Sequence, residues 1–277
     1  MKLSFSTLGC PDWSFDQIVE NAHRMGYSAV ELRGVGSQLR TEKLACMLPE
    51  NHDATRSLLD KNGVSLCGVG TSVRFHDAVE YWDALQEGRR ALELCTELKI
   101  PFIRVFGDAF PDGEAHENVV RRVTEGLASL CAYAASLCPA APVQVLLEVH
   151  GDFNTLPLLR QICDALQYAP GFGLIWDVEN SYLWHGENFV PFYKALRSRI
   201  RHVHIKDCVL KNAKPHPCLP GTGVLPLKAM ITQMLADGYD GYFSFEWEKR
   251  WHPDILPPEQ ALVQYVGFMR ALEAENQ

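Results

Sequence analysis

Four polar side chains interrupt apolar stretches of the sequence, each near the end of a stretch that predicts a buried strand. They are Glu148 in Val-Leu-Leu-Glu-Val, Asp177 in Gly-Leu-Ile-Trp-Asp, His204 in His-Val-His-Ile-Lys and Glu246 in Tyr-Phe-Ser-Phe-Glu. A lone carboxylate among buried apolar groups is costly unless it is paired or binds a metal ion. Because all four residues share the same placement, we expect one common cause.

Three carboxylates and one imidazole form an oxygen-rich donor set. Such a set suits Mn²⁺ or Mg²⁺ better than structural zinc, and it leaves coordination positions for substrate oxygens. We therefore predict one divalent metal ion on Glu148, Asp177, His204 and Glu246, with Mn²⁺ or Mg²⁺ favoured and Zn²⁺ or Co²⁺ left open. Taken singly, each residue has an ordinary explanation: a glutamate in a rim ion pair, an aspartate capping a helix, or a hydrogen-bonded core histidine.

The elements that must position these residues alternate along the chain, as βα units around a parallel sheet do. Strands are expected at Leu3–Thr7, Ala29–Leu32, Ser65–Val69, Phe102–Phe106, Gln144–Val149, Gly173–Asp177, His202–Lys206 and Tyr242–Trp247. Helical periodicity covers Phe15–Met25, Tyr81–Leu98, Val119–Leu137, Pro226–Ala236 and Pro258–Ala274.

Eight such units predict the α/β class and a single (β/α)8 TIM barrel domain over residues 1–277. An open doubly wound sheet has the same alternation, but no GxGxxG turn follows the first strand, where the sequence reads Ser-Thr-Leu-Gly-Cys-Pro-Asp-Trp. In a barrel, consecutive strands lie about 4.8 Å apart, so the four polar side chains would converge at one mouth.

Composition excludes several classes of protein. The net charge of −8 argues against a nucleic-acid partner, which clustered Lys and Arg would hold. No run of 18 apolar residues occurs and the N-terminus does not resemble a signal peptide, so we expect a soluble cytoplasmic protein without a membrane partner. The nine cysteines are odd in number and lack a CxxC pair, which predicts reduced thiols.

The motifs resemble those of the xylose isomerase-like barrels, the sugar isomerase/epimerase superfamily. The resemblance is carried by Leu147-Glu148-Val149-His150-Gly151, Trp176-Asp177, His202-Val203-His204-Ile205-Lys206-Asp207, Gly221-Thr222-Gly223, Phe245-Glu246, and the strands Leu3-Ser4-Phe5-Ser6-Thr7 and Val30-Glu31-Leu32. It implies the same four metal ligands. It also implies that Glu148 and Glu246 form an acid/base pair, which isomerises or epimerises a small sugar, sugar phosphate or related polyol carbonyl compound through a metal-stabilised enediolate.

Two departures from the family pattern keep the substrate open. Many members have a histidine where this chain has Asn180, and an asparagine can hydrogen-bond a hydroxyl but cannot titrate near neutrality. The 3-epimerases also have an arginine soon after the strand-seven histidine, whereas this chain continues Cys208-Val-Leu-Lys211.

Three other functions are weighed against the isomerase or epimerase. A dehydratase of inosose type would begin with the same proton abstraction, so the sequence barely separates it. An apurinic-site endonuclease-like hydrolase would need more histidines, but the third strand ends Gly68-Val-Gly-Thr71 and Asn180 replaces another ligand. A non-catalytic sugar-binding barrel would keep the fold without turnover. The expected partner in the leading hypothesis is a small carbohydrate, and a homodimer or homotetramer is left open.

Further candidate substrate-binding residues flank the predicted ligands. His150 and Lys206 lie two residues beyond Glu148 and His204, on the same strand faces. Asn180 is expected to contact a substrate hydroxyl. Glu31 and Arg104 end the second and fourth strands, where they would hold substrate hydroxyls or pair with each other.

Overall fold

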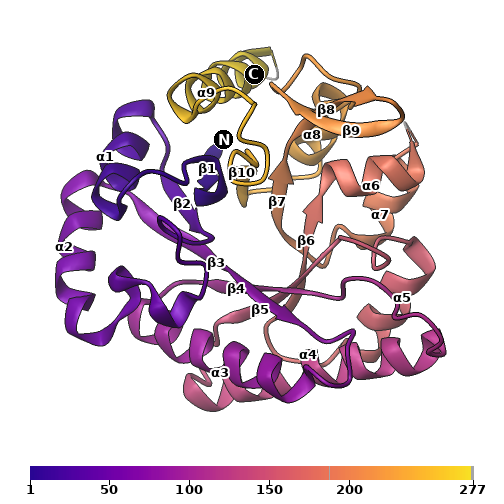
Figure 1. Cartoon of the computed structure of the whole chain (residues 1–277). Coiled ribbons are helices and arrows are strands. Elements are labelled where there is room, and N and C mark those ends of the chain that lie inside the picture. Colours follow the sequence, from indigo (N-terminus) through magenta and orange to yellow (C-terminus); the bar gives the residue numbers. More distant parts are fainter. Residues whose placement is uncertain (187, 276–277) are drawn as a thin grey trace.

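Eight parallel strands close into a barrel in the computed structural model, which describes residues 1–186 and 188–275. The strands, whose order around the barrel is β1-β10-β7-β6-β5-β4-β3-β2, lie at the centre of Figure 1 with the helices around them. Their bounds are β1 Lys2–Ser6, β2 Ala29–Leu32, β3 Ser65–Arg74, β4 Phe102–Phe106, β5 Gln144–Glu148, β6 Phe172–Asp177, β7 Ile200–Ile205 and β10 Tyr242–Phe245. The predicted TIM barrel is confirmed.

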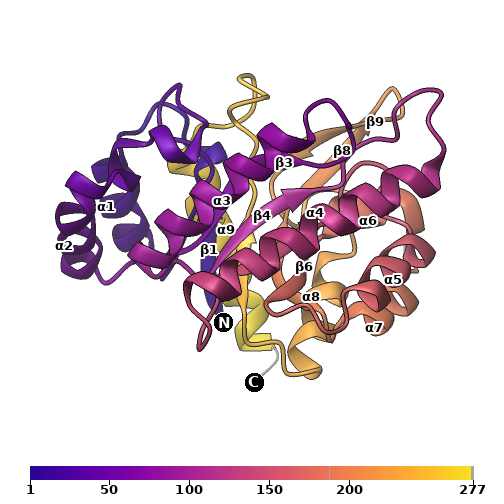
Figure 2. The same cartoon turned by 90° about the horizontal axis from the view of Figure 1, so that it is seen from below.

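Helices cover the outside of the barrel, and Figure 2 shows them packed along the strands from the side. The α-helices are α1 Phe15–Met25, α2 His52–Asn62, α3 Tyr81–Leu98, α4 His116–Leu137, α5 Leu156–Ala165, α6 Val178–His185, α7 Val190–Leu196, α8 Leu227–Ala236 and α9 Pro258–Glu275. Four 3-10 helices are η1 Thr7–Gly9, η2 Thr41–Lys43, η3 Ala45–Met47 and η4 Pro49–Asn51.

Local sequence explains where the first helix begins and ends. Ser14 caps α1 by accepting a hydrogen bond from the amide of Gln17, whose side chain accepts one from the amide of Ser14 in return. Gly26 ends the helix in the left-handed conformation, with φ 86°. The apolar face of α1, made of Ile18, Val19 and Ala22, is buried against the barrel.

An antiparallel hairpin that the sequence did not predict follows β7. Its strands are β8 Asp207–Lys211 and β9 Lys214–Cys218, and Asn212 and Ala213 form its turn. Both turn residues have positive φ, 52° and 61°, as a two-residue hairpin turn of the primed type requires. Glycine is the usual signal for such a turn, and Ala213 does not give it, which is why the pattern was missed.

The strands are buried on both faces, as parallel barrel strands should be. Every residue of β2 and β6 is buried, so the carboxylates within them lie in the same dry environment as their apolar neighbours. All nine cysteines are free thiols, as expected from their number and spacing. Within the described ranges, no helix combines the length and the apolar character needed to cross a membrane.

Candidate metal centre

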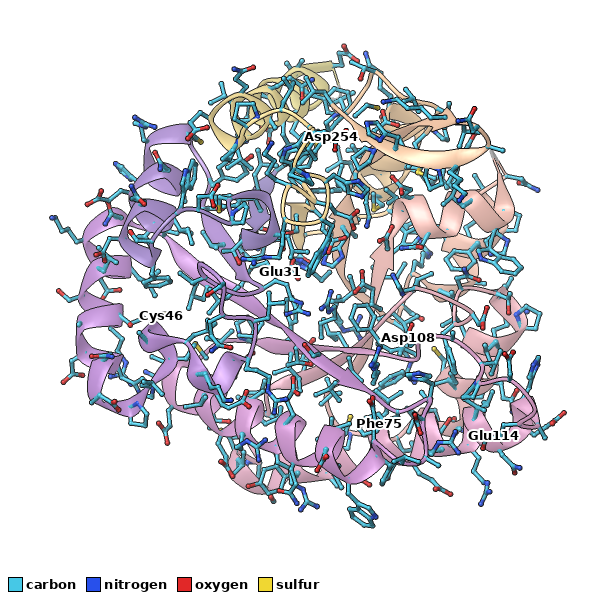
Figure 3. All side chains as sticks on the ribbon, in the orientation of Figure 1. Glu31, Cys46, Phe75, Asp108, Glu114 and Asp254 are labelled. Atoms are coloured by element: carbon cyan, nitrogen blue, oxygen red, sulfur yellow. The ribbon has the colours of Figure 1, made fainter. Side chains whose placement is uncertain are left out.

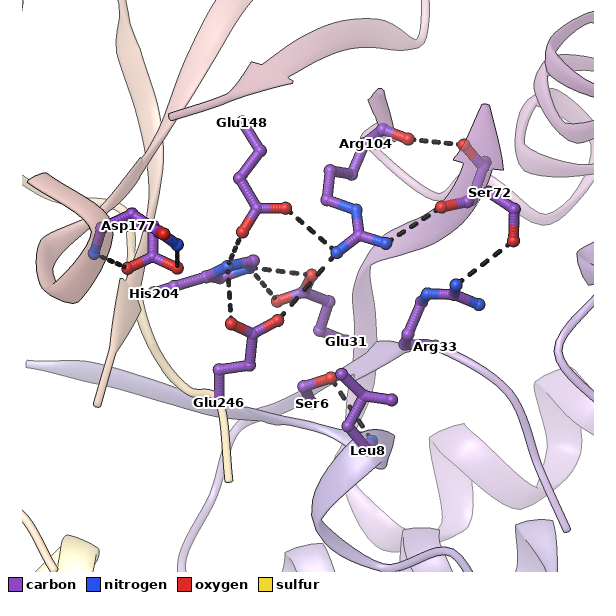
Figure 4. A network of polar contacts seen from close by, with 12 residues as sticks. Ser6, Leu8, Glu31, Arg33, Ser72, Arg104, Glu148, Asp177, His204 and Glu246 are labelled. Carbon is purple, nitrogen blue, oxygen red and sulfur yellow. Dashed lines mark hydrogen bonds and ion pairs between the residues drawn. The ribbon is translucent and has the colours of Figure 1, made fainter. Parts of the chain in front are cut away.

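The four polar residues that interrupt the strand pattern meet at the carboxyl-terminal mouth of the barrel. Glu148 ends β5, Asp177 ends β6, His204 lies in β7 and Glu246 follows β10 directly, and these four strands are neighbours in the sheet. Each residue offers one ligand atom, and the four atoms all lie within 4.8 Å of one another. All four side chains are buried, and Figure 4 shows them grouped with His204 at the centre.

Carboxylates hold the imidazole of His204 on both sides. Its Nδ1 lies 2.9 Å from Glu148 Oε1 and 3.5 Å from Glu246 Oε2, while its Nε2 lies 3.0 Å from Glu31 Oε1. Burial alone would lower the pKa of His204, but Glu246, Glu31 and Glu148 raise that pKa well above its ordinary value. Nδ1 lies beside Glu148 and Glu246, while Nε2 is occupied by Glu31, so Nδ1 is the nitrogen placed to bind a metal ion.

Glu31 lies on the other side of the His204 ring from Glu148. Figure 3 places Glu31 near the barrel axis. Its carboxylate accepts a hydrogen bond from Ser244 Oγ at 2.8 Å and lies 2.9 Å from His202 Nε2. Burial would raise the pKa of this carboxyl, but the imidazoles of His204 and His202 hold that pKa well below its usual range. The sequence left two roles open for Glu31, binding substrate hydroxyls or pairing with Arg104. The observed contacts of Glu31 are with buried protein groups, and its charged partners are histidines and not Arg104.

Arg104 instead pairs with Glu148. Its Nη1 lies 3.0 Å from Glu148 Oε2 and 4.0 Å from Glu246 Oε1, its Nη2 donates to the carbonyl oxygen of Thr71 at 2.9 Å, and its guanidinium lies 4.0 Å above the ring of Phe106. This arrangement shifts the pKa values of the two glutamates in opposite directions. Although burial would raise the pKa of Glu148, Arg104 and His204 lower it strongly, whereas burial raises the pKa of Glu246.

Lys206 lies among carboxylates at the edge of the group. Its Nζ is 2.7 Å from Glu246 Oε2, 2.9 Å from Asp177 Oδ2 and 3.2 Å from Glu248 Oε1. Burial would lower the pKa of Lys206, but these acidic neighbours raise that pKa well above its ordinary value. The ammonium is therefore a fixed positive charge of the site.

Asp177 caps helix α6 as well as facing the other three residues. Its Oδ1 accepts the amides of Glu179 and Asn180, each at 2.9 Å. The side-chain amide of Asn180 donates to Oδ2 at 2.7 Å, so this asparagine orients Asp177. The helix-cap alternative is thus correct for Asp177 and does not compete with its place in the group.

His150 lies beside the four residues and lines an open cavity of about 470 Å³. Its ring packs on Phe106 with centroids 4.9 Å apart, and its buried Nδ1 has no hydrogen-bond partner among the described residues. The cavity extends from His150 across the ends of β2, β3 and β4, the half of the mouth opposite Asp177 and Glu246. Contact of His150 with a substrate remains a prediction, as it does for Lys206, Asn180, Glu31 and Arg104.

Several residues of the site were missed by the sequence interpretation. His202 and Glu248 lie two residues from His204 and Glu246, so the period-two rule could have placed them at the same mouth. Asp207 gave no such signal. Its carboxylate accepts the amides of Gly221 and Gly223, each at 2.9 Å, which gives the Gly-Thr-Gly turn a structural use within the protein.

The donor set fits a divalent cation in charge as well as in geometry. At the mouth, four buried carboxylates (Glu31, Glu148, Asp177 and Glu246) face two fixed cations, Arg104 and Lys206. Once His204 gives up its proton to bind a metal, two negative charges are left uncompensated in a buried space, and one divalent ion would neutralise them. Glu31 would then fix the tautomer of His204 by accepting its Nε2 proton.

The chain is similar in sequence to curated sugar epimerases. Fructoselysine 3-epimerases of Escherichia coli O157:H7 and Shigella flexneri are each 26% identical to this chain over 130 residues. The match covers 45% of this chain and 44% of each relative, so the chain spans less than half the length of these curated relatives.

Solved structures share the fold over nearly the whole chain. A 3-keto-D-glucoside 4-epimerase from E. coli superposes with a TM-score of 0.77 at 20% identity, covering 98% of this chain and 99% of that one. A D-tagatose 3-epimerase-like protein gives a TM-score of 0.76 at 17% identity, covering 100% and 98%. The sequence profile described as xylose isomerase-like TIM barrel matches residues 19–272. With nearly all of its length matched by that profile, this chain belongs to the xylose isomerase-like TIM barrel family.

Proposed function

We propose that this protein is a divalent-metal-dependent isomerase or epimerase of a small sugar, sugar phosphate or related polyol carbonyl compound. The observation that carries the proposal is the pair Glu148 and Glu246. The two carboxylates come from β5 and β10 and meet at one atom, His204 Nδ1, with opposite pKa shifts. Membership of the family and the sugar epimerases among the related proteins support the same class of reaction.

The two glutamates would divide the proton transfers between them. Glu148, which Arg104 holds as a carboxylate, would accept the proton next to the substrate carbonyl. Glu246 would act as the partner in this exchange, taking up a proton during the reaction and returning it to the substrate. A divalent cation on Glu148, Asp177, His204 and Glu246, with Mn²⁺ or Mg²⁺ favoured for so many oxygen donors, would polarise the carbonyl and offset the developing negative charge.

Arg104 and Lys206 would keep the carboxylates in place during this exchange. Both cations are buried and bind the glutamates at 3.0 Å and 2.7 Å, so neither carboxylate needs to reorient toward water. His150 lines the adjoining cavity and would bind a substrate hydroxyl there.

Metal content and isotope exchange together test the proposal. Elemental analysis should find about one divalent ion per wild-type chain and less in Glu246→Gln. Glu248→Gln is the matched control, because this carboxylate lies two residues away and contacts Lys206 but is outside the four-residue group. It should retain the metal.

Turnover of candidate sugars and inososes in D₂O then identifies the reaction. Solvent deuterium in a product of otherwise unchanged composition is expected for an isomerase or epimerase, whereas loss of water would identify a dehydratase. A metal content near three, or none, would contradict the proposed centre. Metal binding without any turnover would instead favour a non-catalytic sugar-binding barrel.

A further inference from the structure

The cavity beside the proposed metal centre has an unusual lining, because most of its side chains are charged. Three arginines face it, Arg33 after β2, Arg40 in the loop that follows, and Arg74 at the end of β3. Its floor is formed by Phe106 and His150, which also border the metal centre. A substrate held by the four-residue group would therefore extend into this cavity with the part of the molecule that does not react.

Two of these arginines already have carboxylate partners. Arg74 lies 3.3 Å from Glu80 and 3.2 Å from Asp108. Arg40 lies 2.9 Å from Glu42 and 3.6 Å from Glu87. Of the carboxylates that line the cavity, Glu80, Glu87 and Asp108 are thus engaged by Arg40 and Arg74, whereas Asp83 has no ion pair within 4.0 Å among the described residues.

Arg33 differs from both. Among the described residues, no carboxylate lies within 4.0 Å of its guanidinium, whose two side-chain hydrogen bonds go to neutral oxygens, the Leu39 carbonyl at 3.3 Å and Ser72 Oγ at 3.2 Å. Figure 4 shows Arg33 directed toward Ser72, on the same side of the site as Arg104. Burial, followed by the repulsion of Arg104, lowers the pKa of Arg33 to about 10, although the charges of Glu87, Glu246 and Glu148 act in the opposite direction.

The charge balance of the proposed metal centre also leaves Arg33 without an anionic partner. One divalent cation neutralises the excess of buried carboxylate over Arg104 and Lys206, and none of that negative charge then remains for Arg33. A guanidinium has five donors in a planar fork that matches a carboxylate or phosphate, and Arg33 uses only two of them.

We propose that Arg33 binds an anionic group of the substrate, a carboxylate or a phosphate, at the end of the molecule remote from the reacting carbon. The inference rests on the proposed function, since it assigns the class of substrate to the same site. It selects anionic sugars or sugar acids over neutral sugars. His150, whose ring lines the cavity, would contribute a second contact to the same substrate.

Titration with inorganic phosphate tests the anion site without turnover. The metal-loaded wild type, Arg33→Met and Arg40→Met are compared by calorimetry. Arg40→Met is the matched control, because Arg40 lines the same cavity but is already paired. Loss of a charged hydrogen-bond partner should raise the phosphate dissociation constant at least about tenfold in Arg33→Met. Arg40→Met should bind phosphate nearly as the wild type does, and any contact of phosphate with the metal itself would be common to all three proteins.

Competition and substrate pairs complete the test. Displacement of phosphate by acetate at similar concentration indicates a carboxylate ligand, whereas weak displacement indicates a phosphate ligand. Arg33→Met should lower kcat/KM about tenfold or more for fructose 6-phosphate or a sugar acid but leave that for fructose unchanged. Arg33→Lys keeps the charge but lacks the planar fork of donors. Its kcat/KM for the anionic substrate should lie between those of the wild type and Arg33→Met.

Equal phosphate binding by wild type and Arg33→Met, or equal loss in Arg40→Met, would overturn the inference. Unfolding temperatures and metal contents of the variants show whether each is intact. If no sugar is turned over by any of the proteins, the proposed function fails, yet the phosphate titration still decides whether Arg33 forms an anion site.

Discussion

At the scale of single residues, the pairing of His204 with Glu31 is the contact that would prepare the proposed metal centre. Glu31 lies 3.0 Å from Nε2, which leaves Nδ1 as the nitrogen that faces Glu148 and Glu246. Outer carboxylates that orient a ligating histidine typically change metal affinity about 10–100-fold. Replacing Glu31 with glutamine keeps the shape but removes the charge, so we expect Glu31→Gln to weaken metal binding by about that factor, measured by titration of the metal-free protein.

Ser244→Ala is the control for this change. Ser244 donates to the same carboxylate at 2.8 Å, and among the described residues its hydroxyl makes no hydrogen bond to the His204 imidazole, so its loss should alter metal affinity much less. Undiminished metal affinity in Glu31→Gln would show that the tautomer of His204 is set by other groups.

Lys206 makes a second prediction at this scale, because its role depends on whether a metal is bound. Its ammonium contacts Asp177, Glu246 and Glu248 at 2.7–3.2 Å. Removing one partner of a buried charge group commonly costs about 3–5 kcal/mol. Lys206→Met should therefore destabilise the metal-free protein by roughly 3 kcal/mol and the metal-bound protein by less, since the cation supplies part of the lost positive charge.

Denaturant unfolding with and without chelator measures both values. Lys228→Met, which removes an exposed ion pair with Glu275, should change the free energy of unfolding by only a few tenths of a kcal/mol, about 0.5 at most. An equal loss for Lys206→Met in both states would mean that Lys206 and the metal ion do not share the same carboxylates.

At the scale of elements, the turn after the β8–β9 hairpin depends on Gly223. A Cβ atom at this position would lie 2.2 Å from Asp207 Oδ1 and 2.4 Å from the carbonyl oxygen of Cys208. The carboxylate of Asp207 accepts the amides of Gly221, Gly223 and Leu225, so it has little freedom to move away. We expect Gly223→Ala to destabilise the protein by about 1–3 kcal/mol, as overpacking does, in thermal unfolding.

The control for Gly223→Ala is another glycine-to-alanine change in the same chain. Gly267 lies in α9, where an added Cβ would contact nothing within 4 Å. Gly267→Ala should stabilise the protein by roughly 0.5–1 kcal/mol, because alanine favours the helix. If Gly223→Ala proved as stable as the wild type, the hydrogen bonds of Asp207 would not hold this turn.

Elements with a regular period were predictable from sequence, and irregular ones were not. The strands Ala29–Leu32 and Phe102–Phe106 and the helices Phe15–Met25 and Tyr81–Leu98 have the bounds that the pattern predicts. β3 runs to Arg74, five residues beyond its predicted end at Val69, because the residues after Val69 carry no apolar alternation to show that the strand continues. The convergence of the four polar residues was also predictable, since strand order alone fixes which ends are neighbours.

Side-chain partners at the site were harder to predict than positions. Nothing in the sequence separates Arg104, which pairs with Glu148, from Arg33, which faces a cavity, because both follow or end a strand at the same mouth. The choice depends on the distance between strands across the barrel, and the order of residues in the chain does not contain that distance. For the same reason the partners of Glu31 came from β7 and β10 and not from β4.

At the scale of the whole molecule, metal binding, protonation and stability should be linked. In the metal-free protein the neighbouring carboxylates raise the pKa of His204, so the imidazole keeps its proton at neutral pH, and burial raises the pKa of Glu246. A metal ion needs both groups deprotonated, and its affinity must therefore rise with pH. The proton on His204 stabilises the metal-free fold fully below pH about 6.5, and this stabilisation is lost as the pH rises through the raised pKa.

We expect the increase in Tm on adding Mg²⁺ or Mn²⁺ to be larger at pH 8 than at pH 6. Displacement of one proton over two pH units changes affinity by up to about 100-fold, which adds about 2.7 kcal/mol of stabilisation when the metal is in excess. For a chain of this size, that free energy corresponds to roughly 5–10 °C. Differential scanning fluorimetry with metal or chelator at both pH values measures the difference, and Glu248→Gln should preserve it because that carboxylate is outside the group. A metal-induced increase in Tm that is equal at the two pH values, or larger at pH 6, would mean that the bound ion does not compete with protons on His204 and Glu246, and the cation would then have to lie elsewhere.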